Sequence, residues 1–82
     1  MINIKYIVII EDGEEVGNLA IDLFKDDKGY VFVHSTSEKD DMKKALLTLP
    51  DLIIINADNL RNDIFKTCQI VREDKESIIT PI

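Results

Sequence analysis

Acidic and amide side chains follow two of the apolar runs in this chain. Glu11 and Asp12 come directly after the first run, and Asn56 and Asp58 follow the third. If both runs are parallel strands of one sheet, their carboxyl ends lie at the same edge, where open α/β sheets bind ligands. Three carboxylates in one small site repel one another, and a hard divalent cation such as magnesium relieves that repulsion through oxygen ligands.

A second interpretation of the first acidic pair is structural. Carboxylates at the start of a helix accept hydrogen bonds from its free N–H groups and complement its dipole. Glu11 and Asp12 precede a helical pattern, so they are also expected to cap that helix. The sequence alone leaves both interpretations open.

The elements that must position these residues follow from the apolar pattern. Apolar runs at 6–10 and 52–55, the first rich in β-branched residues, predict buried strands, and residues 30–34 predict a further strand. Apolar residues at helical spacing predict three helices, the last ending near Glu73. The three apolar stripes consist of Val16, Leu19, Ala20, Leu23 and Phe24, then Met42, Ala45, Leu46 and Leu49, then Ile64, Phe65, Cys68 and Val71.

Several residues predict where the elements begin and end. Gly29 is expected to end the first helix, and Ser37 is expected to be the N-cap of the second, with Asp40 three residues on. Pro50 stops the second helix and favours extended geometry at Leu49. Residues 78–82 indicate the start of a fourth strand.

The order β-α-β-α-β-α, followed by this start of a further strand, predicts an α/β fold. A parallel sheet with helices on both faces, doubly wound by right-handed crossovers, satisfies this order. With 82 residues, the chain is one domain at most. We therefore expect the N-terminal part of a flavodoxin-like sheet.

Composition excludes several classes of function. The formal net charge is −6 and the calculated pI is about 4.6, which disfavours a nucleic-acid-binding surface. No apolar run reaches the roughly 18–20 residues that span a bilayer. Glu14 and Glu15 lie where a dinucleotide-binding loop would need glycines, and they would repel a pyrophosphate. A single cysteine and the lack of an export signal predict a cytoplasmic protein without disulfides.

Two segments together resemble the receiver domain of two-component response regulators. Residues 7–12, Ile-Val-Ile-Ile-Glu-Asp, are similar to the strand and acidic pair that open a receiver. Residues 50–56, Pro-Asp-Leu-Ile-Ile-Ile-Asn, are similar to the strand that carries the phospho-acceptor aspartate, with Asn56 in the acceptor position. Residues 63–65, Asp-Ile-Phe, lie where the family often has Asp-Gly-Phe. The resemblance covers residues 1–82 as a partial receiver domain.

The resemblance implies roles for the four polar residues. Glu11 and Asp12 correspond to the acids of the family's magnesium site, and Asp58 would contribute its backbone carbonyl. Asn56 departs from the pattern, because an amide is a poor nucleophile and cannot form an acyl phosphate. The Thr or Ser and the Lys that the family carries on its fourth and fifth strands fall beyond Ile82. We therefore expect weak magnesium binding at most.

The resemblance thus predicts a degenerate receiver, not an enzyme. Such a module acts through protein contacts, with an output domain, a histidine kinase or a second copy as its partner, and without nucleic acid or membrane. The alternative is a phosphotransfer-competent receiver whose acceptor was changed to Asn56. A distant alternative is a Toprim-like metal-dependent nucleic-acid enzyme, which pairs a Glu such as Glu11 with a later Asp-x-Asp.

Three further expectations concern the remaining residues and the sheet edge. His34 is expected to be a surface histidine away from the polar edge of the sheet, and Cys68 is expected to lie in the core. An uncovered third strand would present an open apolar edge. The chain is therefore expected to be a homodimer or a fragment of a larger protein.

Overall fold

Three strands form one parallel sheet. The computed structural model describes residues 3–73, in which β1 (Lys5–Ile10) lies between β2 (Tyr30–Ser35) and β3 (Leu52–Ile55). The sheet order is β2-β1-β3, and both pairs are parallel. The predicted fold class, the N-terminal part of a flavodoxin-like α/β sheet, is confirmed. The expected start of a fourth strand at 78–82 lies outside the described residues.

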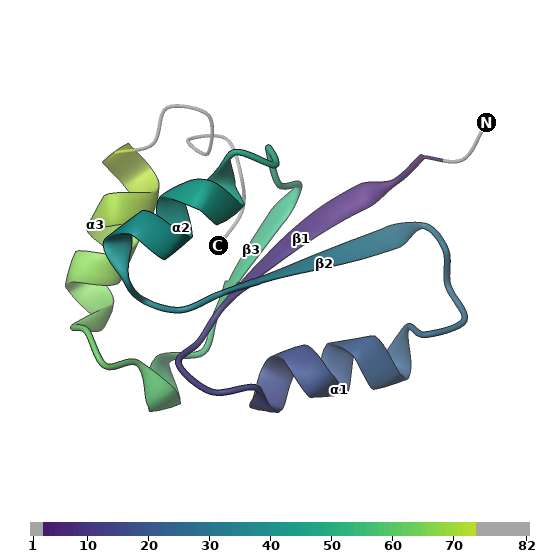
Figure 1. Cartoon of the computed structure of the whole chain (residues 1–82), viewed down its shortest axis with the longest axis horizontal. Helices are drawn as coiled ribbons and strands as arrows, with labels where there is room; N and C mark the ends of the chain where they lie inside the picture. The colour runs from purple at the N-terminus through teal and green to yellow at the C-terminus, as the bar shows by residue number, and fades with distance from the viewer. Residues whose placement is uncertain (1–2, 74–82) are drawn as a thin grey trace.

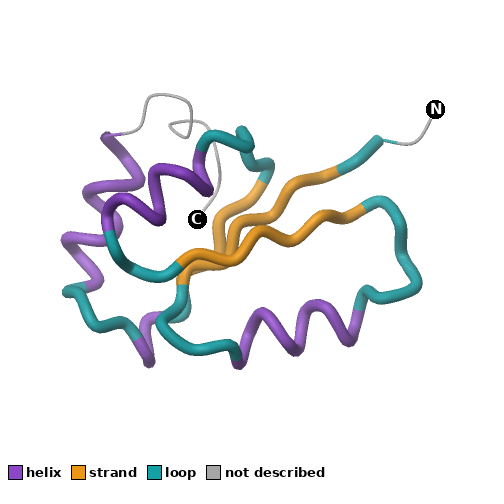
Figure 2. Tube along the Cα trace, viewed as in Figure 1, coloured by secondary structure: helices purple, strands orange, loops and turns teal. Residues whose placement is uncertain are grey.

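Helices cover both faces of this sheet (Figure 1). Helix α1 (Glu15–Leu23) lies on one face, whereas α2 (Lys39–Leu46) and α3 (Ile64–Glu73) lie on the other. A short 3-10 turn, η1 (Ala57–Asn59), connects β3 to α3. Figure 2 shows that the loops after β1 and β3 reach the same end of the sheet. No helix within residues 3–73 has the length and apolar character needed to cross a membrane.

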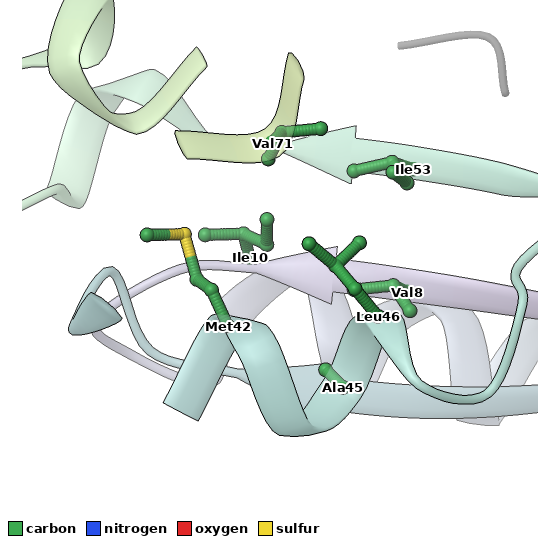
Figure 3. Close-up of a cluster of buried hydrophobic side chains, with 7 residues drawn as sticks. All are labelled: Val8, Ile10, Met42, Ala45, Leu46, Ile53 and Val71. Carbon is green, nitrogen blue, oxygen red and sulfur yellow. The ribbon is translucent and has the colours of Figure 1, made fainter. Parts of the chain in front are cut away.

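The larger core lies between the sheet and the helices α2 and α3 (Figure 3). Met42 and Leu46 of α2 are fully buried against β1 and β3. Burial of these side chains removes their apolar surface from water and holds α2 on the sheet. The cluster comprises Val8, Ile10, Met42, Ala45, Leu46, Ile53 and Val71.

A smaller core lies under α1, and here the predicted stripe is partly wrong. Helix α1 buries Gly17 and Ala20, and Ala20 packs with Ile7 and Ile9 of β1. Leu19 and Leu23, which were expected to be buried, are 57% and 68% exposed. The small side chains of Gly17 and Ala20 let α1 approach the sheet closely. Because these two residues face the sheet, Leu19 and Leu23 lie on the exposed side of the helix.

Two expectations about the ends of α2 are also wrong. The N-cap is Glu38, without a side-chain capping bond, because the Ser37 hydroxyl donates to Asp12 instead. Leu49 is not extended but has a φ of 54° and is 59% exposed. Its N–H continues the helical turn by donating to the carbonyl of Leu46, so the chain must reverse at Leu49 before β3 begins.

Helix α3 has the predicted bounds but a different buried face. Thr67 and Val71 are fully buried, whereas Phe65 is 82% exposed and Cys68 is only half-buried. Residues 65 and 67 are 200° apart on a helix of 3.6 residues per turn, so burial of Thr67 exposes Phe65. The prediction of a core position for Cys68 is therefore wrong. Ile70, which was not part of the predicted stripe, packs against the larger core.

The packing of α2 predicts opposite results for two neighbouring leucines. Leu46 is fully buried, whereas Leu47 is 76% exposed. Leu46→Ala is expected to lower the free energy of unfolding by about 2–5 kcal/mol, because it leaves a cavity in the larger core. Leu47→Ala is expected to change it by less than about 0.5 kcal/mol. Urea denaturation of both variants measures the difference, and equal losses would contradict this packing.

Candidate functional site

The Glu11 carboxylate lies at the carboxyl end of β1 and is completely buried. Its Oε1 atom accepts a hydrogen bond from the N–H of Val16 at 3.1 Å, and Oε2 accepts from the N–H of Gly17 at 2.7 Å. These N–H groups belong to the first turn of α1 and have no partner within the helix. Glu11 therefore caps α1, as the structural interpretation of the acidic pair predicted.

The absence of a side chain at Gly17 favours this close approach. A Cβ atom at position 17 would lie 3.2 Å from Cδ2 of His34 and 3.4 Å from Oε2 of Glu11. Because the first contact is tighter than most real Cβ contacts, a larger residue would require the His34 ring to shift by a few tenths of an ångström. The glycine thus lets a backbone N–H reach a buried oxygen.

Asn56 lies at the end of β3 and faces the same carboxylate. Its backbone N–H donates to the carbonyl of Ile10 at 3.0 Å, which continues the pairing of β3 with β1. Its side-chain Nδ2 donates to Oε1 of Glu11 at 3.1 Å, and its Oδ1 accepts from the N–H of Asp58 at 3.3 Å. An ionised aspartate could accept the second bond but could not donate the first.

The hydrogen bonds keep the Glu11 carboxylate ionised despite its burial. Burial by itself raises the pKa of this group, because it removes the charged form from water. The N–H donors of Gly17, Asn56, Val16 and Asn59 outweigh that effect and hold the pKa below its ordinary value. The site therefore stabilises a buried negative charge with neutral donors.

His34 lies next to Glu11, and its expected position away from this edge is wrong. Its Nε2 atom is 2.8 Å from the carbonyl oxygen of Gly13 and 3.4 Å from Oε2 of Glu11. A carbonyl only accepts, so Nε2 carries a hydrogen. Position 34 pairs with Ile9 of β1. His34 thus lies near the carboxyl end of β2, at the same edge as Glu11. Its position at the end of the second apolar run is the sequence feature that could have predicted this.

Asp12 faces a different set of donors. Its carboxylate accepts from the backbone N–H of Ser37 at 2.9 Å, from the Ser37 hydroxyl at 2.6 Å and from the N–H of Arg61. Asn62 donates to the carbonyl of Ser37 at 2.8 Å. Asp12 thus ties the loop after β2 to the loop after β3. It does not cap α1.

The pKa of Asp12 also lies below its ordinary value. Burial raises this pKa, but hydrogen bonds and charge outweigh that effect. The groups that lower the pKa are the Ser37 hydroxyl, the N–H groups of Ser37 and Arg61, and the Arg61 charge. Asp41 behaves similarly, because the N–H and hydroxyl of Thr36 both donate to its carboxylate and lower its pKa. Ionised carboxylates therefore organise the loops after β2 and β3.

The arrangement brings Glu11 and Asn56 together but does not gather the predicted magnesium ligands. All four carboxylate oxygens of Glu11 and Asp12 accept hydrogen bonds, and Asp58 is exposed. Within residues 3–73, no group of three or more His, Cys, Asp or Glu side chains could hold a metal ion. In this arrangement the carboxylates do not form a cation site. Magnesium at Glu11, Asp12 and Asp58 stays a prediction, and binding would require the carboxylates to exchange hydrogen bonds for contacts with the ion.

The lowered pKa of Glu11 predicts acid sensitivity. A carboxyl group whose pKa is lower in the folded state stabilises the fold above its unfolded pKa, about 4.3 for Glu. That stabilisation is lost as the pH falls through the folded value. Glu11→Gln is expected to lower stability by about 1–3 kcal/mol at pH 7 and to flatten the decline below pH 4.3. Urea denaturation between pH 7 and 3 tests this.

The exposed Glu15 provides the control for that experiment. It lies in the first turn of the same helix and is exposed. Glu15→Gln should keep the pH profile of the unmodified chain. A Glu11→Gln variant with an unchanged profile would show that the buried carboxylate does not carry the acid sensitivity.

The hydrogen bond of the Asn56 amide predicts that an acid at this position lowers stability. In Asn56→Asp, a second carboxylate replaces the donor 3.1 Å from Glu11 Oε1. The repulsion and the lost hydrogen bond are expected to lower stability by about 1–3 kcal/mol at pH 7. Asn18→Asp, on the exposed face of α1, is the matched control. Equal stability of both variants, measured by thermal unfolding, would argue against the Asn56–Glu11 bond.

Comparisons with known proteins identify no relative. The chain matches no protein-family model, no curated protein and no solved structure. The receiver resemblance therefore rests on residues 7–12, 50–56 and 63–65, and on a sheet order that is compatible with it.

Proposed function

We propose that this chain is a degenerate receiver module of two-component signalling, which works through protein contacts rather than phosphotransfer. The support comes from the acidic pair after β1, the strand motif at 50–56 and the β2-β1-β3 sheet. These features bring Glu11 and Asn56 to one end of the sheet, where the receiver family has its acceptor site.

The hydrogen bond from Asn56 Nδ2 to Glu11 Oε1 carries the proposal. In a receiver with an aspartate at this position, two carboxylates would repel each other, and a cation would relieve that repulsion. Here an amide N–H takes the place of the cation as the partner of the buried carboxylate. The site is therefore electrostatically satisfied as it stands, and it has no carboxylate nucleophile.

The same arrangement gives the module a fixed signalling surface. Asp12 holds the loops after β2 and β3 together through Ser37 and Arg61. Asn56 holds the turn after β3 through the N–H of Asp58. A protein partner would thus meet one constant loop conformation. An output domain, a histidine kinase or a second copy in the cytoplasm is the proposed kind of partner, and the module itself is not an enzyme.

Phosphorylation by a small-molecule donor tests the proposal. The chain is incubated with acetyl phosphate and magnesium, and its intact mass is measured. No phosphoryl group should be gained, because the amide of Asn56 cannot attack phosphorus. A stable gain of one phosphoryl group by the unmodified chain would overturn the proposal in favour of a phosphotransfer-competent receiver.

Asn56→Asp is the matched variant for this experiment. Magnesium is expected to raise its thermal midpoint, because a second carboxylate makes cation binding favourable, and to leave the unmodified chain nearly unchanged. An equal magnesium response from both proteins would show that Asn56 does not replace a cation. Glu11→Gln in the Asn56→Asp background should abolish the response.

A further inference from the structure

Strand β2 is an edge of the described sheet and has free backbone groups on its outer side. The carbonyls of Gly29 and Ser35 accept hydrogen bonds from the N–H groups of Lys5 and Glu11 at 2.8 and 2.9 Å. Backbone direction alternates along a strand. The N–H and C=O groups of Tyr30, Phe32 and His34 therefore point away from β1, and β1 is the partner of β2 within residues 3–73.

This edge carries none of the usual features that prevent pairing with another chain. Natural edge strands are often protected by lysine, proline or a bulge. Strand β2 reads Tyr-Val-Phe-Val-His-Ser and pairs with β1 over six residues in continuous register. Tyr30 and Val31 are 39% and 38% exposed. The edge is thus six residues long, free of lysine and proline, and partly accessible.

We propose that this edge pairs antiparallel with β2 of a second copy of the chain. A two-fold axis makes such an interface self-complementary and requires antiparallel strands. The three outward residues then set the register. Phe32 lies opposite Phe32 of the second copy, and Tyr30 lies opposite His34. A register shifted toward the loop would need the N–H of Thr36, which already donates to Asp41.

The side chains of the outward residues match in this register. Tyr30, Phe32 and His34 share one face of β2, because they alternate along the strand. Phe24 joins them from the end of α1, with ring centroids 5.2 Å from Tyr30 and 5.8 Å from Phe32. Phe32 of one copy would therefore meet Phe32 of the other, and Tyr30 would meet His34, and such cross-strand pairs are stabilising.

The charges at the ends of the paired strands oppose this association at low salt. Lys28 precedes β2 and would lie opposite Thr36 of the second copy. Thr36 holds the Asp41 carboxylate through its N–H and hydroxyl, both at 2.8 Å. Asp26 and Asp27 precede Lys28, and Glu38 and Asp40 follow Thr36, so each end of the paired strands brings acids of both copies together. These acids and the charge of −6 on each copy repel, and salt that screens them is expected to favour the dimer.

The inference rests on the proposed interaction function and names its partner and its surface. It predicts one continuous sheet of the order β3-β1-β2-β2-β1-β3 across the two copies. The predicted acceptor site lies at the loops after β1 and β3, so loss of dimerisation and gain of phosphate are separate results.

Sedimentation equilibrium of the 82-residue chain tests the dimer. The unmodified chain is expected to reach twice its 9.4 kDa mass, more readily in high salt, which screens the net charge. Val31→Lys, which places a lysine opposite Val33 of the second copy, should weaken the dimer by about tenfold or more. Leu47→Lys is the control at an exposed apolar position outside β2.

Hydrogen exchange gives a second measurement that does not need a variant. The amides of Tyr30, Phe32 and His34 should become protected as the chain concentration rises, while exposed loop amides remain unchanged. A chain that stays monomeric at millimolar concentration would overturn the inference. So would a dimer that Val31→Lys, folded by circular dichroism, leaves intact, or one without protection at these three amides.

Discussion

The buried carboxylate of Glu11 is the interaction on which the functional end of this molecule depends. A charge without access to water must find donors, and the donors here come from more than one element. The first turn of α1 supplies two N–H groups, β3 supplies the Asn56 amide, and β2 places His34 alongside. One side chain therefore sets where α1 begins, how closely it approaches the sheet and which way Asn56 points.

This constraint explains why an amide is well suited to position 56. The carboxylate needs donors, and the backbone N–H of Asp58 needs an acceptor. Asparagine provides both in one side chain, with Nδ2 toward Glu11 and Oδ1 toward Asp58. Aspartate at the same place would require an external positive charge to reach the same balance. In the proposed receiver, a single amide group thus replaces the cation that an aspartate at position 56 would need.

The two adjacent acids, Glu11 and Asp12, have different structural roles. Glu11 points toward α1 and Asn56, while Asp12 points toward Ser37 and Arg61. Consecutive residues at the end of a strand face opposite sides of the sheet. The two neighbouring acids therefore contact different parts of the structure. Within residues 3–73, β2 and β3 are the two edges of the sheet, and the β2 edge is the proposed site of contact with a second copy.

The sequence by itself determined the class of the fold, because β-branched runs and helical stripes depend on local periodicity. It predicted β3 and α3 at their observed bounds and brought Glu11 and Asn56 to one edge. Only the tertiary structure decided which face of each helix is buried, as Leu19, Phe65 and Cys68 illustrate, since a stripe can rotate to fit its neighbours. It also decided the roles of Ser37 and His34, because their partners are remote in sequence and lie within reach only once the strands align.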